Sequence, residues 1–285
     1  MASKRTQRGR SMNMVGGYGG SAPRELARIA SDISLWWCDL DLPVAEIERL
    51  AATLSSTEHA RAARFGTDAL RRRWIAGRAS LRRVLGEALR LPPPDVPIAR
   101  GQRGRPELRG IEGGPDFNVS HTGGVALIGL WHAGGRDARI GVDVERAARE
   151  VGADRLARKF LTQGEYAMIA DLEPDDRRRR FLRYWTCKEA MSKATGDGLL
   201  APFRNIEVDL QAAPRLVGGP APYQPPAWTL FTAPVPDGHF ATVALWDRGG
   251  IIHRPASDTS SASAATENPR DFREPPVPSA ARMFP

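Results

Sequence analysis

The sequence is poor in cysteine and has no long apolar run, and each absence narrows the class of protein. Cys38 and Cys187 are the only cysteines among 285 residues, and they form no Cys-x-x-Cys pair. The sequence therefore predicts two reduced, partly buried thiols. No apolar run reaches the ~18 residues of a membrane span, so we expect no membrane partner. Residues 1–10 are basic but no apolar segment follows them, which argues against a secretory signal and favours the cytoplasm.

Positive charge is in excess, with a formal net charge of +8 and an isoelectric point near 10.1. Such an excess favours an acidic partner, which could be a nucleic acid, a membrane surface, an acidic protein or a polyphosphate. Residues 1–25 hold five basic residues against one acidic residue, and residues 249–285 hold four of each. The rest of the chain carries only about half of the excess, which is low for a dedicated nucleic-acid-binding protein. We therefore expect no nucleic acid as partner, and keep a basic nucleic-acid-binding protein as the alternative.

The two ends of the chain differ in composition from its middle. Residues 1–30 are rich in Gly, Ser and Arg, and residues 249–285 are rich in Ser, Ala and Pro. Both segments should be disordered, because they hold too few large apolar side chains to offset the entropy of ordering. Between them we expect two lobes, an N-terminal lobe over residues 31–136 and a C-terminal lobe over residues 137–248.

The middle of the chain predicts mixed helices and strands. Helices are expected over residues 43–54, 56–65, 68–91, 154–161, 162–172 and 175–196, and strands over residues 33–40, 138–145, 205–210, 228–233 and 239–246. Residues 115–132 are expected to form two short strands around a turn at residues 122–124. The second half repeats the order of the first, and each long helix carries a mid-helix tryptophan, Trp74 or Trp185. This weak repeat predicts an α/β (α+β) fold of two similar lobes with a ligand cleft between them.

Two acidic residues alternate in the strand expected over residues 138–145. Asp143 and Glu145 lie two positions apart, so their side chains point to the same face of the strand. Two carboxylates on one face repel each other unless a cation neutralises them, which predicts a metal site. A strand end with two solvated acids is the alternative.

The helix expected over residues 175–196 carries a third carboxylate. Glu189 and Lys193 are four residues apart and share a helix face, whereas Lys188 lies one position round the helix. Glu189 would complete an oxygen cage for Mg²⁺ with the two strand carboxylates, and Lys193 could then reach a pyrophosphate. A surface ion pair between Glu189 and Lys193 is the alternative.

Ser120 and His121 lie where a strand meets a glycine turn, in Phe-Asn-Val-Ser-His-Thr-Gly. Adjacent strand residues point to opposite faces, so this pair is poorly placed to act as a nucleophile and its base. A phosphate-binding turn is more natural, and a turn histidine is the alternative. Arginine side chains can also bind phosphate in a bidentate manner, although most should be solvated. The arginines considered are Arg61, Arg64, Arg71, Arg72, Arg73, Arg78, Arg82, Arg83 and Arg105.

In combination, these motifs resemble the signature of the 4′-phosphopantetheinyl transferase superfamily. Gly-Val-Asp-Val-Glu precedes Trp-Thr-Cys-Lys-Glu-Ala-x-x-Lys, with 45 residues from Asp143 to Lys188. The upstream Phe-Asn-Val-Ser-His-Thr-Gly and Gly-Arg-Pro-Glu-Leu resemble the long, pseudo-dimeric surfactin-type (Sfp-like) branch. The resemblance covers about residues 33–248. It implies two similar α/β lobes related by a pseudo-twofold axis, with coenzyme A at their interface, in a monomer.

The resemblance also implies roles for individual residues. Asp143, Glu145 and Glu189 match the Mg²⁺ ligands of the family, and Lys193 matches the lysine on the pyrophosphate. The residues expected to contact coenzyme A are Arg61, Arg73, Arg105, Ser120, His121, Lys188 and Lys193. Of these, Arg61 and Arg73 match basic residues near the 3′-phosphate, Ser120 and His121 match the phosphate-binding turn, and Arg105 matches the lysine of a Gly-Lys-Pro element. Glu58 stands where the family has a lysine near the nucleotide, so one contact is expected to be missing.

The implied reaction transfers the 4′-phosphopantetheine group from coenzyme A to a serine of an apo carrier protein and releases 3′,5′-ADP. Mg²⁺ and basic side chains would offset the growing negative charge. Glu189, directly or through a metal-bound water, would accept the serine proton. The sequence does not distinguish an acyl, peptidyl or aryl carrier as the partner. A catalytically inactive carrier-binding homologue is the remaining alternative, although all the matched acids are present.

Overall fold

The computed structural model of the chain describes residues 22–133 and 138–248. Residues 1–21 and 249–285, for which the sequence predicts disorder, lie outside the described residues. The helices are α1 (Val44–Ala51), α2 (Ser56–Ala62), α3 (Asp68–Leu89), α4 (Ala153–Phe160), α5 (Gln163–Ala170) and α6 (Pro174–Thr195). The strands are β1 (Arg24–Glu25), β2 (Ile33–Asp39), β3 (Ile98–Arg100), β4 (Pro106–Leu108), β5 (Asp116–Thr122), β6 (Val125–Trp131), β7 (Ala138–Arg146), β8 (Glu207–Asp209), β9 (Arg215–Gly218), β10 (Trp228–Thr232) and β11 (His239–Asp247).

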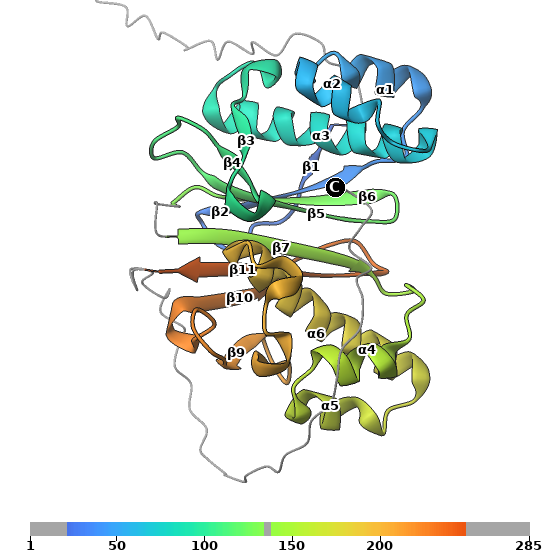
Figure 1. Ribbon diagram of the computed structural model, residues 1–285, viewed down its shortest axis with the longest axis vertical. Helices are drawn as coiled ribbons and strands as arrows, with labels where there is room; N and C mark the ends of the chain where they lie inside the picture. Colours follow the sequence, from blue (N-terminus) through green and yellow to red (C-terminus); the bar gives the residue numbers. More distant parts are fainter. Residues whose placement is uncertain (1–21, 134–137, 249–285) are drawn as a thin grey trace, which may run out of the picture.

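These elements form layers, with helices outside and two sheets inside (Figure 1). α1, α2 and α3 lie over an antiparallel sheet with the strand order β1-β2-β6-β5. α4, α5 and α6 lie on the far side of a second antiparallel sheet with the order β10-β11-β7. The expected α+β class, with a helix layer on a sheet in each half, is confirmed.

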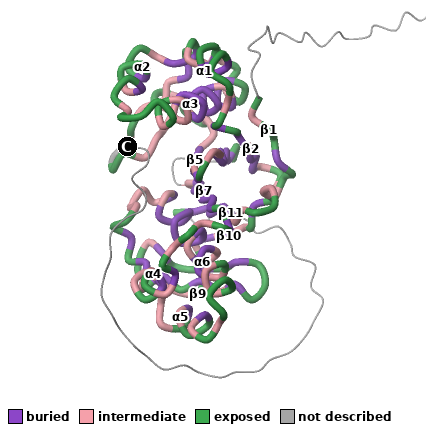
Figure 2. The backbone as a smooth tube through the Cα atoms, turned by 90° about the vertical axis from the view of Figure 1, so that its right-hand side faces the viewer, coloured by how far each residue is buried: buried purple, intermediate pink, exposed green. Residues whose placement is uncertain are grey.

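Three clusters of buried apolar side chains hold these layers together, and Figure 2 shows the buried backbone running through the middle of each half. The first cluster, which includes Leu85, lies between α1, α3 and their sheet. The second, which includes Met191, lies between α6 and the other sheet. The third joins the two sheets and includes Val142 of β7. The third cluster therefore joins the two halves through the facing sides of their sheets.

β5 and β7 run side by side where the two sheets meet. Alternate side chains of β5 accept hydrogen bonds from alternate backbone N–H groups of β7. The pairs are Asp116 Oδ2 with Ile140 N at 2.7 Å, Asn118 Oδ1 with Val142 N at 3.1 Å, and Ser120 Oγ with Val144 N at 3.2 Å. This ladder of side chains fixes the register of β7 against β5, and hence the place of the β7 carboxylates.

The start of the described chain is more ordered than the sequence predicts. β1 pairs with β2, Leu26 N donates to the carbonyl of Leu35 at 2.8 Å, and the Leu26 side chain is only 7% exposed. Leu26 belongs to the apolar cluster between the two sheets. This corrects the expectation of disorder up to residue 30 for residues 22–30, because one buried leucine anchors a segment that is otherwise polar.

The ends of the helices follow from local sequence. Ser55 caps α2 and forms the expected capping box with Glu58. α3 ends at Leu89, two residues before the predicted end, because Arg90 adopts a left-handed conformation with φ of 56°. α6 ends at Thr195, and the next residue, Gly196, has a φ of 81°, which favours glycine. In the described residues, no helix is long and apolar enough to cross a membrane.

α6 lies very close to β7. A Cβ atom at Gly141 of β7 would lie 1.9 Å from the carbonyl oxygen of Ala190 and 2.8 Å from the backbone nitrogen of Ala194. Glycine is therefore needed here, because only a residue without a side chain lets the helix backbone touch the strand. This approach brings the last turns of α6, with Glu189 and Lys193, beside the β7 carboxylates.

Candidate active site

Three carboxylates converge at the contact between β7 and α6. Asp143 and Glu145 come from β7 and Glu189 from α6, and all three are at least 90% buried. Burial, followed by the charge of Asp143, raises the pKa of Glu145 to about 7, and the same two causes raise the pKa of Glu189 to about 7. The structure thus brings the three expected metal ligands into one electrostatically coupled cluster.

Two cations lie among these acids. Lys193 Nζ donates to Asp143 Oδ1 at 2.6 Å and to Ser120 Oγ at 2.8 Å. Arg149, four residues beyond Glu145, forms an ion pair with that carboxylate. Lys193 therefore lies in the site as the sequence predicts, and Arg149 is a member that sequence reasoning missed.

The three carboxylates supply oxygen ligands of the kind that a hard cation prefers, although they are not arranged around one. In residues 22–133 and 138–248, no group of three or more His, Cys, Asp or Glu side chains is positioned to hold a metal ion. However, Asp143 Oδ2 and Glu189 Oε1 are buried and have no hydrogen-bond partner. Buried anionic oxygens without partners are costly, and oxygen donors of this kind suit Mg²⁺. These carboxylates could hold the ion if Lys193 leaves Asp143.

Ser120 and His121 point to opposite sides of β5, as their adjacent positions predict. Ser120 Oγ donates to Asp143 Oδ1 at 2.8 Å and also accepts from Lys193 and from the backbone N–H of Val144. Its hydroxyl is thus fully used inside the protein. The hydroxyl therefore orients Asp143 and Lys193, and the expected phosphate-binding turn at Ser120 and His121 stays a prediction.

His121 lies on the α3 side of β5. A Cβ atom at Gly77 of α3 would be 3.2 Å from His121 Nε2, so the helix leaves room for the ring only because residue 77 is glycine. Burial, and secondly the charge of Lys193, lower the pKa of His121 to about 4. The ring is therefore neutral at pH 7 and could donate one N–H to a phosphate.

The arginines expected near the 3′-phosphate differ in their surroundings. The Arg61 guanidinium lies 5.8 Å from the centre of the Trp74 ring. Burial lowers the pKa of Arg61, and so do the neighbouring Arg100, Arg78 and Arg64. Such a concentration of positive charge suits an anion.

Arg73 instead has a partner of its own. Its Nε and Nη2 atoms donate to the carboxylate of Asp41 at 2.6 Å and 2.9 Å. The Asp41 side chain is 61% exposed, so this pair is open to solvent and to exchange with another anion. Arg73 could therefore bind a phosphate only if the phosphate replaced the Asp41 carboxylate as its partner.

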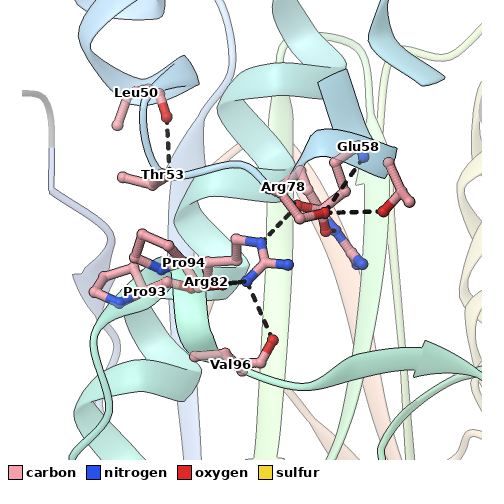
Figure 3. A network of polar contacts seen from close by, with 10 residues as sticks. Leu50, Thr53, Glu58, Arg78, Arg82, Pro93, Pro94 and Val96 are labelled. Atoms are coloured by element: carbon pink, nitrogen blue, oxygen red, sulfur yellow. Dashed lines mark hydrogen bonds and ion pairs between the residues drawn. The ribbon is translucent and has the colours of Figure 1, made fainter. Parts of the chain in front are cut away.

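Glu58, the departure from the family pattern, has a structural role that Figure 3 shows. Its carboxylate lies between Arg78 and Arg82, and Arg82 also donates to the carbonyls of Pro93, Pro94 and Val96. Burial alone would raise the pKa of Glu58, but the two arginines hold it below its ordinary value. Glu58 thus ties α2 to α3 and offsets part of the positive charge there.

Two residues expected to bind coenzyme A lie elsewhere. Lys188 is fully buried, where its Nζ donates to the carbonyls of Phe203 and Ile206 at 2.6 Å each and pairs with Glu165 at 2.7 Å. Successive helix residues are rotated by about 100°, so Lys188 faces the interior of the second half while Glu189 faces β7. This corrects the expectation for Lys188.

Arg105 is also buried, with hydrogen bonds from each of its three guanidinium nitrogens to protein atoms. This corrects the expectation that it contacts coenzyme A, since no edge of the guanidinium is free. The residues that accept these bonds include Asp116, which sequence reasoning missed. The alternation of polar side chains at positions 116, 118, 120 and 122 of β5 could have indicated that Asp116 lies on the same strand face as Ser120.

Comparison with known proteins relates both halves of the chain to one family. A family model described as the 4′-phosphopantetheinyl transferase superfamily matches residues 139–243, which include the three carboxylates and Lys193. A second model, described as 4′-phosphopantetheinyl transferase, N-terminal, matches residues 43–130. The two matches together cover both helix-on-sheet halves, as in the long branch of the family.

Two relatives compared by sequence agree with these matches. The 4′-phosphopantetheinyl transferase HetI of Nostoc is 38% identical over 226 residues, which are 78% of this chain and 91% of HetI. A 4′-phosphopantetheinyl transferase of Bacillus subtilis is 26% identical over 178 residues, 61% of this chain and 75% of that protein. A solved holo-(acyl-carrier-protein) synthase of Bacillus anthracis, in complex with CoA (3′,5′-ADP), covers 39% of this chain and 96% of its own, with 21% identity and a TM-score of 0.32.

Proposed function

The chain belongs to the 4′-phosphopantetheinyl transferase superfamily, and from this premise we propose that it transfers the 4′-phosphopantetheine group of coenzyme A to a serine of an apo carrier protein. The observation that carries the proposal is the buried cluster of Asp143, Glu145 and Glu189 with Lys193 beside it. A cluster of acids with unpartnered oxygens is costly to a structure, so it is best explained by a catalytic role.

The reaction joins the serine Oγ to the β-phosphorus of coenzyme A and breaks the bond from that phosphorus to the bridging oxygen. The leaving group is 3′,5′-ADP, and the serine proton needs an acceptor. Glu189 is the candidate acceptor, directly or through a water, because its carboxylate lies in the acid cluster and its Oε1 atom makes no hydrogen bond within the protein.

Asp143, Glu145 and Glu189 would hold the Mg²⁺ that the family implies. When bound, this ion would supply positive charge that offsets the charge of the pyrophosphate in the transition state. Lys193, released from Asp143, would then direct its ammonium to the pyrophosphate, while the Ser120 hydroxyl continues to hold Asp143 in place.

The adenosine end of coenzyme A would lie toward α2 and α3. Arg61, with the arginines around it, would bind the 3′-phosphate, and Arg73 would join it by exchanging Asp41 for the ligand. His121, as a neutral N–H donor, would approach the pyrophosphate. We further propose that the enzyme acts as a cytoplasmic monomer on an acyl, peptidyl or aryl carrier.

Release of 3′,5′-ADP tests this proposal. The chain is incubated with coenzyme A, Mg²⁺ and apo acyl, peptidyl or aryl carrier domains, and the nucleotide is measured by chromatography. We expect release only when all components are present, and none from the Asp143→Ala variant at low millimolar Mg²⁺. Release without a carrier, or wild-type release from Asp143→Ala, would contradict the assignment.

A further inference from the structure

Arg105 lies at the junction of the two halves and contacts the end of the helix that carries Lys193. We propose that Arg105 is a positioning residue for the transfer reaction, one that fixes Lys193 by capping the C-terminal end of α6. The proposal rests on the proposed function, because it gives Lys193 a role at the pyrophosphate. It differs from a contact of Arg105 with coenzyme A, which the sequence predicts.

The guanidinium of Arg105 is used completely by protein atoms. Nη1 and Nη2 bind the carboxylate of Asp116 at 3.0 Å and 2.7 Å, and the side chain is only 9% exposed. The remaining acceptors are backbone carbonyls, namely those of Lys193 for Nε at 3.1 Å, Phe117 and Ile140 for Nη2 at 3.0 Å and 2.8 Å, and Pro106 for Nη1 at 3.4 Å. These are six contacts for five N–H groups, so at least one N–H of Nη2 is shared between two acceptors, and the three N–H groups of a lysine could not replace the planar fork.

The bond to the Lys193 carbonyl acts on a helix end. The last four carbonyls of a helix have no partner within it, and they carry its negative partial charge. Lys193 lies in the last turn of α6, which ends at Thr195, and Ser192 O is already bound by the N–H of Gly196. Arg105 therefore supplies the partner and the positive charge that the Lys193 carbonyl needs.

The same side chain joins elements from both halves. Asp116 and Phe117 belong to β5, Ile140 to β7 and Lys193 to α6, so one guanidinium sets three elements in relation to one another. The Lys193 ammonium meets Asp143 and Ser120, which lie on β7 and β5. Holding the Lys193 backbone to these strands thus fixes the point from which its side chain reaches Asp143 or, in the proposed reaction, the pyrophosphate.

The kinetic test separates positioning from binding. In Arg105→Lys and Arg105→Ala, we expect kcat to fall by about 10- to 100-fold, because a displacement near 1 Å at a catalytic group costs about that much. KM for coenzyme A should stay within about twofold, since no contact with the substrate is lost. Arg139→Ala is the matched control, because Arg139 also pairs with Asp116, at 3.2 Å, but has no bond to Lys193. The Arg139→Ala variant should retain the kcat of the wild type.

Hydrogen exchange gives a readout that does not depend on activity. Amide exchange at Thr195 and Gly196 should become faster in both Arg105 variants and stay unchanged in Arg139→Ala. A rise in KM with kcat retained would overturn the proposal in favour of a substrate contact. Faster exchange with unchanged kcat would show that Arg105 stabilises the helix end without affecting catalysis. Unchanged exchange would show that Arg105 does not cap α6. Loss of transfer by the wild-type chain would contradict the proposed function and leave the exchange result standing.

Discussion

Glu189 illustrates at the residue scale how a fold sets the chemistry of a side chain. Its pKa is raised to about 7 by burial and by Asp143, and one of its oxygens has no partner. An acid whose pKa is raised on folding holds its proton longer in the folded state than in the unfolded one. The contribution of Glu189 to the stability of the metal-free protein should therefore be fully present below about pH 4.5 and should be lost as the pH rises through 7.

The Glu189→Gln variant tests this linkage. It cannot ionise, so its stability relative to wild type should increase by ~1–3 kcal/mol between about pH 5 and pH 8 in metal-free buffer. His121 has a contribution of the opposite sign below about pH 6.5, and both proteins keep it, so this contribution cancels in the difference. Urea unfolding at the two pH values measures the effect, with the exposed Glu87→Gln as control. An equal difference at both pH values would refute the raised pKa.

Arg61 should act on binding rather than on chemistry. Arg61→Ala should raise KM for coenzyme A by an amount equivalent to ~1.5–3 kcal/mol and change kcat little, because the 3′-phosphate is remote from the reacting phosphorus. On 3′-dephospho-coenzyme A the variant and wild type should become nearly equal. Arg71→Ala is the control, since Arg71 pairs with the exposed Asp68 instead. A penalty that persists on the dephospho substrate would show that Arg61 only packs against Trp74.

The residue types of the site could be predicted from the sequence because they depend on short-range spacing. Asp143 and Glu145 share a face through the period of a strand, and Glu189 and Lys193 through the period of a helix. The roles of Arg105 and Lys188 could not be predicted from the sequence, because each role depends on partners distant in the chain. Lys188 meets carbonyls 15 and 18 residues away, and Arg105 meets one 88 residues away.

At the scale of elements, the site depends on the direct contact of α6 with β7 at Gly141. Gly141→Ala should destabilise the protein strongly, because its Cβ would lie 1.9 Å from the Ala190 carbonyl and no flexible side chain can yield. We expect a loss of ~2–4 kcal/mol in the free energy of unfolding and a large fall in kcat, as α6 moves from the strand. Gly66→Ala, where nothing lies within 4 Å, is the control. A stable, active Gly141→Ala would disprove the contact.

The long helices and strands could be predicted because their local sequence patterns are strong. The short strands could not, because their sequence patterns are weak. α3 and α6 follow from helical periodicity, and β7 from its alternation. β1, β3, β4 and β9 have two to four residues each and are defined by their pairing. Pairing is a long-range property, so the sequence pattern alone could not predict them.

At the scale of the whole molecule, the site lies where two halves meet, and neither half forms it alone. Ser120 comes from the first half and Asp143, Glu145, Glu189 and Lys193 from the second. The side-chain ladder from β5 to β7 and the Arg105 contacts set the halves against each other. The limits of the two lobes, residues 31–136 and 137–248, stay predictions.

The ends of the chain give a prediction about the whole molecule. Residues 22–248 alone should keep the activity and melting temperature of the full chain, because residues 1–21 and 249–285 are poor in large apolar side chains. A chain that begins at residue 31 should be less stable, by at least the ~1.5–3 kcal/mol of burying Leu26 between the sheets. Thermal unfolding of the three proteins compares them. Equal melting temperatures for the two truncated chains would show that β1 and Leu26 contribute nothing.

The intact mass of an apo carrier protein tests the central claim most directly. Apo acyl, peptidyl and aryl carrier domains are incubated with the chain, coenzyme A and Mg²⁺, and weighed by mass spectrometry, with HetI as positive control. The account predicts that at least one carrier gains the mass of one 4′-phosphopantetheine group, and that the same carrier with its serine changed to alanine gains none. If HetI modifies these carriers while the folded chain leaves all of them unchanged, the assigned activity is contradicted.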